Sequence, residues 1–186
     1  MKKIRLGSIE LSDRVVVSDP CYNRDTWCMD DNVPVKPGKY DVFLTLSDEK
    51  EWGTRVASLL VANSDFIGVE RKRFPKWEVY SSSIGVDSGQ CGIFDNSVYP
   101  QKNLTDEEID SEDSFYSECC DITLKKLQGG ILRSKKGVVT SSGYGDGSYE
   151  LSVIKQKGEN VALMLDYSLQ SMRGIMEKIC ERSCVQ

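Results

Sequence analysis

The sequence contains no histidine among its 186 residues. This absence excludes Ser-His-Asp and Cys-His nucleophile systems, zinc peptidases of the H-E-x-x-H type and phosphoesterases that depend on histidine. An enzyme with this sequence would have to use carboxylates, Lys, Tyr, Cys or a metal held by carboxylates. The composition therefore favours a non-catalytic protein and leaves an enzyme as the alternative.

Long hydrophobic runs are also missing. No stretch approaches the roughly 20 apolar residues that span a bilayer, and the basic residues within positions 1–7 are not followed by the apolar run of a secretory signal. Hydrophobic residues make up 39% and charged residues 28% of the chain, as in a water-soluble globule. We expect a cytoplasmic protein without membrane contact.

The seven cysteines lack the spacing of a metal or redox site. Their number is odd and no C-x-x-C pair occurs, so neither a disulfide framework, a zinc ribbon nor a thioredoxin-type motif is expected. We expect most of them to be small core residues. The sequence predicts no cofactor and no bound metal.

A concentrated basic surface is missing as well, because the compact basic runs, such as 71–73 and 135–136, are no longer than three residues. The net charge is −5, and the segment 105–121 carries eight acidic residues with no Lys or Arg. The rest of the chain holds 24 basic and 21 acidic residues and is nearly neutral. Duplex nucleic acid is therefore not an expected partner.

Short β-branched and aromatic segments separated by turn residues predict the fold class. We expect a mainly β (α+β) protein: an antiparallel β-sandwich or distorted barrel with two peripheral helices. The polar turn at 155–160 predicts a hairpin over 148–166. The expected strands are 14–18, 40–46, 55–62, 66–70, 77–80, 83–86, 92–94, 137–140, 148–155 and 160–166.

Two helices are expected. Thr105 and Glu108 fit a capping box, and Leu104 with Ile109 fits the hydrophobic staple that often accompanies one. The second helix is expected within 168–186, where apolar residues follow helical spacing. Its stripe consists of Leu169, Met172, Ile175, Met176, Ile179 and Cys180.

The expected strands and helices divide the chain into a single β-rich domain, 1–167, and a C-terminal amphipathic helix, 168–186. The helix would pack on its own domain or on a partner, and the oligomeric state is expected to be monomer or homodimer. Neither an interdomain linker nor an internal repeat is visible.

Four segments, 18–22, 51–57, 85–95 and 141–149, combine glycine, acidic and aromatic residues beyond what packing requires. Glycine allows the close approach of a ligand or a second backbone, and an aromatic ring can stack on a planar group. We expect them to bind a small polar or anionic ligand or a host protein. The candidate binding residues are Asp19, Tyr22, Trp52, Arg55, Asp87, Gln90, Asp95, Tyr144 and Asp146.

Three other interpretations remain open. Asp19, Asp87, Asp95 and Asp146 could serve a hydrolase or transferase as an acid–base pair or as metal ligands. Cys21 or Cys91 could be a nucleophile, although without histidine a thiolate would need another activator. The simplest interpretation is that the aspartates cap turns and that Asp-Gly closes a hairpin.

The four segments also carry recognisable words: Ser-Asp-Pro-Cys-Tyr at 18–22, Trp-Gly-Thr-Arg-Val-Ala at 52–57, Val-Asp-Ser-Gly-Gln-Cys-Gly-Ile-Phe-Asp at 86–95 and Ser-Gly-Tyr-Gly-Asp-Gly-Ser-Tyr at 142–149. In this order they resemble an uncharacterised family of bacterial and phage-borne proteins, a domain of unknown function. The resemblance covers roughly 14–166. It implies one domain and a mobile-element setting, where small proteins often counter or tune host systems, and it implies no specific activity.

Overall fold

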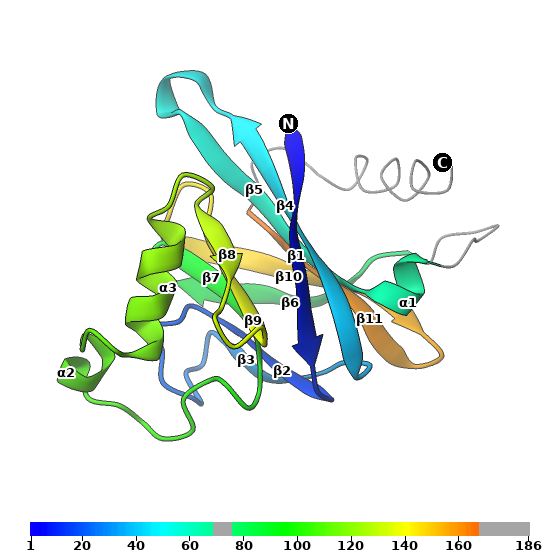
Figure 1. The fold of residues 1–186 in the computed structure, drawn as a ribbon, viewed down its shortest axis with the longest axis horizontal. Helices are drawn as coiled ribbons and strands as arrows, with labels where there is room; N and C mark the ends of the chain where they lie inside the picture. The colour runs from blue at the N-terminus through cyan, green and yellow to red at the C-terminus, as the bar shows by residue number, and fades with distance from the viewer. Residues whose placement is uncertain (69–75, 168–186) are drawn as a thin grey trace.

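Eleven strands form two antiparallel sheets in the computed structural model, which describes residues 1–68 and 76–167 (Figure 1). Sheet A has six strands in the order β1 (Lys2–Leu11), β4 (Gly38–Asp48), β5 (Thr54–Asn63), β11 (Glu159–Asp166), β10 (Gly147–Gln156) and β6 (Glu78–Val86). Sheet B has five, in the order β3 (Asp30–Pro34), β2 (Arg14–Ser18), β7 (Gln90–Asp95), β9 (Gly137–Ser141) and β8 (Gly129–Ile131).

The main core lies between the two sheets. Alternate residues of β4 point inward, so that Tyr40, Val42 and Leu44 are fully buried against sheet B residues such as Val15 and Ile93. Burial of one such aliphatic side chain stabilises the fold by about 1.5–3 kcal/mol. This shared core makes the architecture a sandwich.

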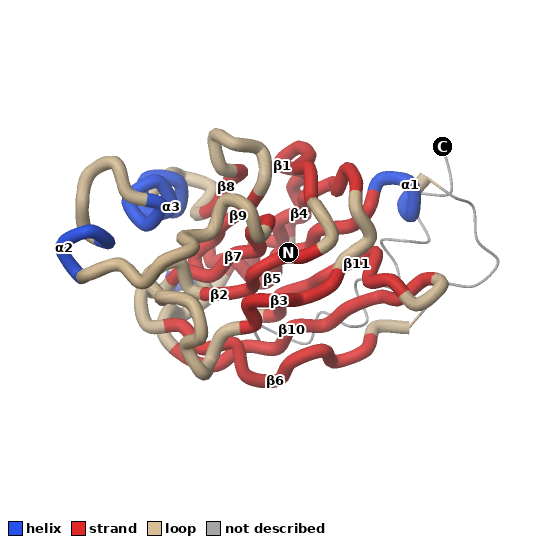
Figure 2. The backbone as a smooth tube through the Cα atoms, turned by 90° about the horizontal axis from the view of Figure 1, so that it is seen from below, coloured by secondary structure: helices blue, strands red, loops and turns tan. Residues whose placement is uncertain are grey.

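Two smaller apolar clusters cover the outer faces. On sheet B, helix α3 (Phe115–Thr123) packs Cys119 and Ile122 against Phe94 and Val139. On sheet A, the one-turn helix α1 (Ser64–Ile67) contributes to an outer cluster. The helices are thus peripheral, and Figure 2 shows α2 (Asp106–Ile109) and α3 at the opposite end of the molecule from α1.

The described chain crosses between the sheets four times, and the crossings come in two pairs. Residues 12–13 and 35–37 cross at one end of the sandwich, where the Val35 N–H donates to the carbonyl of Asp13 at 2.9 Å. Residues 87–89 and 142–146 cross at the other end, where the Ser142 N–H donates to the carbonyl of Gly89 at 3.0 Å. Each end is therefore closed by two crossings that bond to each other.

The predicted fold class is confirmed in its sandwich form, since the described strands make two sheets and no closed barrel. The 148–166 hairpin is present as β10 and β11. The capping box is also present, with Thr105 and Glu108 each accepting from the other's backbone N–H. It begins a helix of only one turn.

Other local predictions were wrong or concern residues outside the described ranges. A strand was predicted at 66–70, but the Asn63 side chain accepts from the Phe66 N–H and begins α1 instead; residues 69–75 lie outside the described residues. Strands β1, β3 and β8 and helices α1 and α3 were not predicted. The predicted C-terminal helix, 168–186, also lies outside the described residues.

Candidate functional site

Asp19 directly follows β2 and is fully buried. Its Oδ2 accepts from the backbone N–H groups of Asp87 at 2.9 Å and Ser88 at 2.7 Å. Its Oδ1 accepts from the Cys21 N–H at 3.0 Å and the Ser88 hydroxyl at 2.6 Å. Asp19 thus ties the first predicted segment to the third, and we call Asp19, Cys21, Asp87 and Ser88 the Asp19 anchor.

Tyr22 extends this connection to the surface. Its hydroxyl donates to Oδ2 of Asp87 at 2.8 Å, and its carbonyl accepts from the hydroxyl of the buried Tyr99 at 2.7 Å. Burial and the bond to Asp87 raise the pKa of the Tyr22 phenol well above its ordinary value, so it stays a neutral donor. The Asp87 side chain is exposed, and Tyr22 is half-buried.

The third and fourth segments meet through their backbones. Gly89 has φ +70°, which favours glycine, and its carbonyl accepts from the Ser142 N–H at 3.0 Å. The Tyr149 hydroxyl then donates to the carbonyls of Ser142 at 2.8 Å and Gly145 at 2.6 Å. These bonds fix the turn that carries Tyr144.

Tyr144 brings the second segment into the same region. Its hydroxyl donates to Oε2 of Glu49 at 2.7 Å. Its ring meets the Trp52 ring edge to face, with centroids 6.3 Å apart and planes at 86°. The Arg55 guanidinium lies 5.9 Å from the Tyr144 ring centroid, and its Nε donates to the Trp52 carbonyl at 3.1 Å. We call Glu49, Trp52, Arg55 and Tyr144 the aromatic tip.

The aromatic tip is both exposed and ordered. Trp52 is 68% exposed and Tyr144 56% exposed. Hydrogen bonds from Ser47 and Tyr144 hold the pKa of Glu49 below its ordinary value, and the same Glu49 bond raises the pKa of Tyr144. The ionised carboxylate and the neutral phenol are therefore the stable pair at neutral pH, which keeps the bond between them in place.

Three predicted site residues do not join these clusters. Gln90 is buried and binds α3, accepting from the Thr123 hydroxyl at 3.0 Å and donating to Sγ of Cys120 at 3.3 Å. Asp146 is exposed on the turn beside Tyr144. Asp95 lies at the far end of β7, where its carboxylate accepts from the backbone of Ser12 and Ser97.

The cysteine interpretation finds no geometric support. Burial and the neighbouring Asp19 raise the pKa of the Cys21 thiol far above its ordinary value. Burial does the same to Cys91, which is fully buried. Both thiols are therefore protonated at neutral pH and are poor nucleophiles. Among residues 1–68 and 76–167, no cluster of three or more Cys, Asp or Glu is placed to hold a metal ion.

Sequence reasoning missed Glu49 and the roles of Ser88 and Tyr99. Glu49 precedes the second segment by two residues, and all four residues of 48–51 are charged. This run of charges was the feature of the sequence that could have indicated Glu49. Ser88 was inside a predicted segment without a role. The contacts of Tyr99 with the backbone of Asp19 and Tyr22 join residues more than 70 positions apart, which no local pattern indicates.

The chain matches no family model, no curated protein and no solved structure. The resemblance to a bacterial and phage-borne family stays a prediction. In the part of the chain that the structure describes, no helix is long and apolar enough to cross a membrane.

Proposed function

We propose that this is a non-catalytic binding protein that recognises a cytoplasmic host protein through the aromatic tip. The observation that carries the proposal is that Trp52 and Tyr144 are exposed while each is held by a specific contact. An exposed ring that is already ordered loses little conformational entropy on binding. Trp, Tyr and Arg are also the residues that most often dominate the energy of protein–protein interfaces.

The use of the carboxylates favours binding over catalysis. The carboxylate oxygens of Asp19 and Asp95 accept hydrogen bonds from backbone N–H groups and hydroxyls. Aspartates with such bonds stabilise turns. Asp87 already accepts from the Tyr22 hydroxyl, and Asp146 lies exposed on the adjoining 142–146 crossing. A hydrolase or transferase with these four aspartates would need two free carboxyl groups facing one substrate.

The exposure of the rings favours a protein partner over a small polar or anionic ligand. Small-molecule sites are concave and bury most of the ligand surface. The aromatic tip instead joins Tyr144 of the 142–146 crossing to the hairpin between β4 and β5, and the turn of that hairpin projects beyond the rest of the sandwich (Figure 1). Arg55 would contact an acidic or carbonyl group of the partner, and the phage setting implied by the resemblance suggests a host regulatory or defence protein.

A photo-crosslinking experiment tests this proposal. A benzophenone amino acid is placed at Trp52 and, as a matched control, at Trp27, which is 89% exposed and outside the tip. We expect a discrete crosslinked host protein from position 52 alone. With that partner purified, Trp52→Ala should weaken binding about 30-fold or more, as loss of a binding hot spot does.

Two further variants sharpen the result. Tyr144→Ala and Arg55→Ala should each weaken binding, while Trp27→Ala should leave the dissociation constant unchanged. Equal crosslinking from positions 27 and 52, or full affinity in Trp52→Ala, would show that the tip is not the binding surface.

A further inference from the structure

The flank of the molecule formed by α2 and α3 is acidic at one end. Residues 105–113 carry six acidic residues and no basic ones, and all six are exposed. Within the described residues, an ion pair neutralises only Glu108, through Lys102 at 3.1 Å. Figures 1 and 2 show α2 standing away from the two sheets. We call residues 105–113 the acidic arm.

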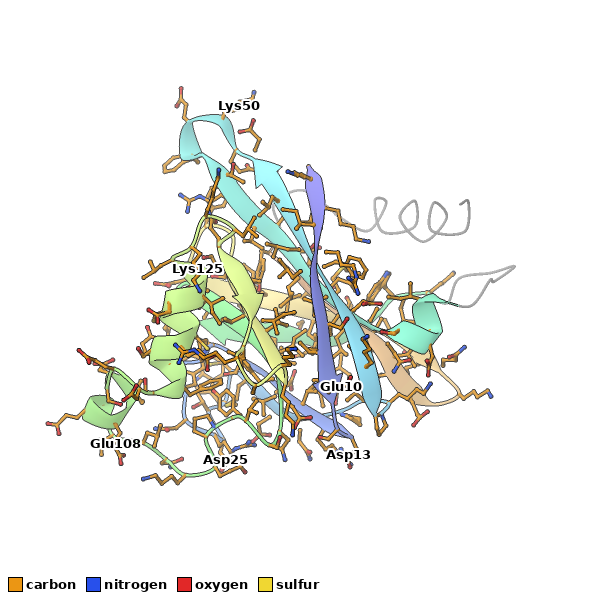
Figure 3. All side chains as sticks on the ribbon, in the orientation of Figure 1. Glu10, Asp13, Asp25, Lys50, Glu108 and Lys125 are labelled. Carbon is orange, nitrogen blue, oxygen red and sulfur yellow. The ribbon has the colours of Figure 1, made fainter. Side chains whose placement is uncertain are left out.

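The other end of the same flank is basic and apolar. Lys125 and Lys126 follow α3, between Leu124, which is 85% exposed, and Leu127, which is 39% exposed. Figure 3 shows Lys125 near one end of α3 and Glu108 beyond the other. The two lysines make this end complementary in charge to an acidic surface.

This basic end borders an open groove of about 480 Å³. The groove forms because β4 and β5 extend past sheet B, and the Gln128 side chain binds the Thr54 carbonyl at 2.8 Å to hold the turn after α3 beside them. Apolar side chains and two lysines dominate its lining, with one acid. Its charged side chains are Lys2, Lys126 and Asp48, and its apolar side chains include Ile4, Leu46 and Leu127.

We propose that the acidic arm of one copy of this protein binds the basic groove of a second copy. The charges are complementary, and the half-buried Ile109 gives the arm an apolar residue among its acids. The arm and the groove are different surfaces at opposite ends of one flank. We infer a head-to-tail contact, in which a copy whose arm is bound keeps its own groove free for a further copy. The assembly then grows beyond a dimer, into a ring where the rotation between copies closes and into an open chain where it does not.

Charge complementarity without a large apolar area gives a weak, salt-sensitive contact. Sedimentation velocity should show a weight-average mass that rises with protein concentration at about 50 mM salt. At about 500 mM salt the apparent dissociation constant should be at least about tenfold higher, because the Debye length falls below the spacing of the charges.

Two variants isolate the two surfaces. The groove variant reverses the charge of Lys126, which lines the groove, and of its neighbour Lys125, with Lys126→Glu and Lys125→Glu. The arm variant removes four charges, with Glu107→Gln, Asp110→Asn, Glu112→Gln and Asp113→Asn. All six positions are exposed, so thermal melting should confirm that both variants fold. Each variant alone should be monomeric, since each has lost one half of the contact.

An equimolar mixture of the two variants is the decisive sample. The intact arm of the groove variant should bind the intact groove of the arm variant and form a 1:1 pair that does not grow further. The control Lys135→Glu with Lys136→Glu, which makes the same charge change elsewhere, should associate like the native protein.

Four results would overturn the proposal. The first is a native protein that stays monomeric up to about 1 mM, and the second is a mass that levels off at that of a dimer. The third is continued self-association of the groove variant or the arm variant alone. The fourth is a control variant that is as monomeric as the groove variant.

Discussion

The two ends of the sandwich have similar buried aspartates but different exposed side chains. At one end Asp19 binds the backbone of the 87–89 crossing, and at the other Asp95 binds the backbone of the 12–13 crossing. Both aspartates are fully buried or nearly so. Only the Asp19 end also carries the aromatic tip, on the neighbouring 142–146 crossing and the β4–β5 hairpin.

This comparison separates structural from functional residues. Asp19 and Asp95 lie at opposite ends of the sandwich, so they cannot belong to one functional site. Their shared role is to hold a crossing in place. The aromatic tip has no counterpart at the Asp95 end among the described residues. Substitutions of the two aspartates should therefore lower stability more than substitutions in the aromatic tip.

Replacing Asp19 should have the largest effect on stability. Asp19→Ala leaves three backbone N–H groups and the Ser88 hydroxyl without their acceptor, and should cost about 3 kcal/mol. For a chain of this length, that lowers the melting temperature by about 6–12 °C. The matched control is Asp87→Ala, which removes an exposed carboxylate that accepts from the Tyr22 hydroxyl and should cost less than about 1 kcal/mol. Equal melting temperatures for Asp19→Ala and the native protein would refute the anchor.

Replacing Asp95 should have a smaller and pH-dependent effect. Burial tends to raise the Asp95 pKa, but hydrogen bonds from Ser97 and Ser12 outweigh it and lower the pKa below its ordinary value. The ionised form is therefore favoured in the folded protein, and its contribution is present above the ordinary pKa near 4 and lost as the pH falls through the lowered value.

Asp95→Asn should accordingly cost about 1–2 kcal/mol at pH 7. Urea unfolding at pH 7, 5 and 3 should show this difference persisting at pH 5 and shrinking toward pH 3. A difference that grows as the pH falls would mean that Asp95 is neutral in the folded state.

Truncating the aromatic tip should barely change stability. Trp52→Ala and Tyr144→Ala remove exposed rings, so the free energy of unfolding should change by no more than about 0.5 kcal/mol. Denaturant unfolding compares them with Asp19→Ala. A loss of 2 kcal/mol or more from either would make the tip a structural element and remove the main support for a binding surface.

The smallest expected effect is on the titration of one phenol. Glu49 raises the pKa of Tyr144 by accepting its hydrogen bond. Glu49→Gln should therefore move the Tyr144 pKa back toward its ordinary value near 10, as followed by NMR of the labelled ring. An unchanged titration would show that the bond does not persist in solution.

Features fixed by neighbouring residues could be predicted from the sequence. The capping box joins Thr105 to Glu108, three residues away, and the β10–β11 hairpin joins two strands that follow each other directly in the sequence. Both are present. Strand β1 was missed because it is a half-exposed edge strand with a bulge between Arg5 and Gly7, which interrupts any alternation. Helix α3 was missed because its apolar face is interleaved with the acids of 105–121.

The candidate site was only partly predictable for a different reason. Asp87 and Asp95 stand in one sequence word, which suggested a common site. Most of this word is strand β7, however, and an extended strand of its six residues spans about 20 Å. Its two aspartates therefore lie at opposite ends of the sandwich. Conversely, Asp19 and Asp87 are 68 positions apart and in contact.

The four crossings also have a consequence for how the protein is made. Neither sheet is a continuous stretch of chain: sheet B is complete only with β9, at Ser141, and sheet A only with β11, at Asp166. A ribosome releases the chain from its N-terminus, so sheet B cannot be finished before Ser141 has emerged, nor sheet A before Asp166. Until β7 and β11 emerge, β2 and β5 each keep an unpaired edge, and the core between the sheets cannot close.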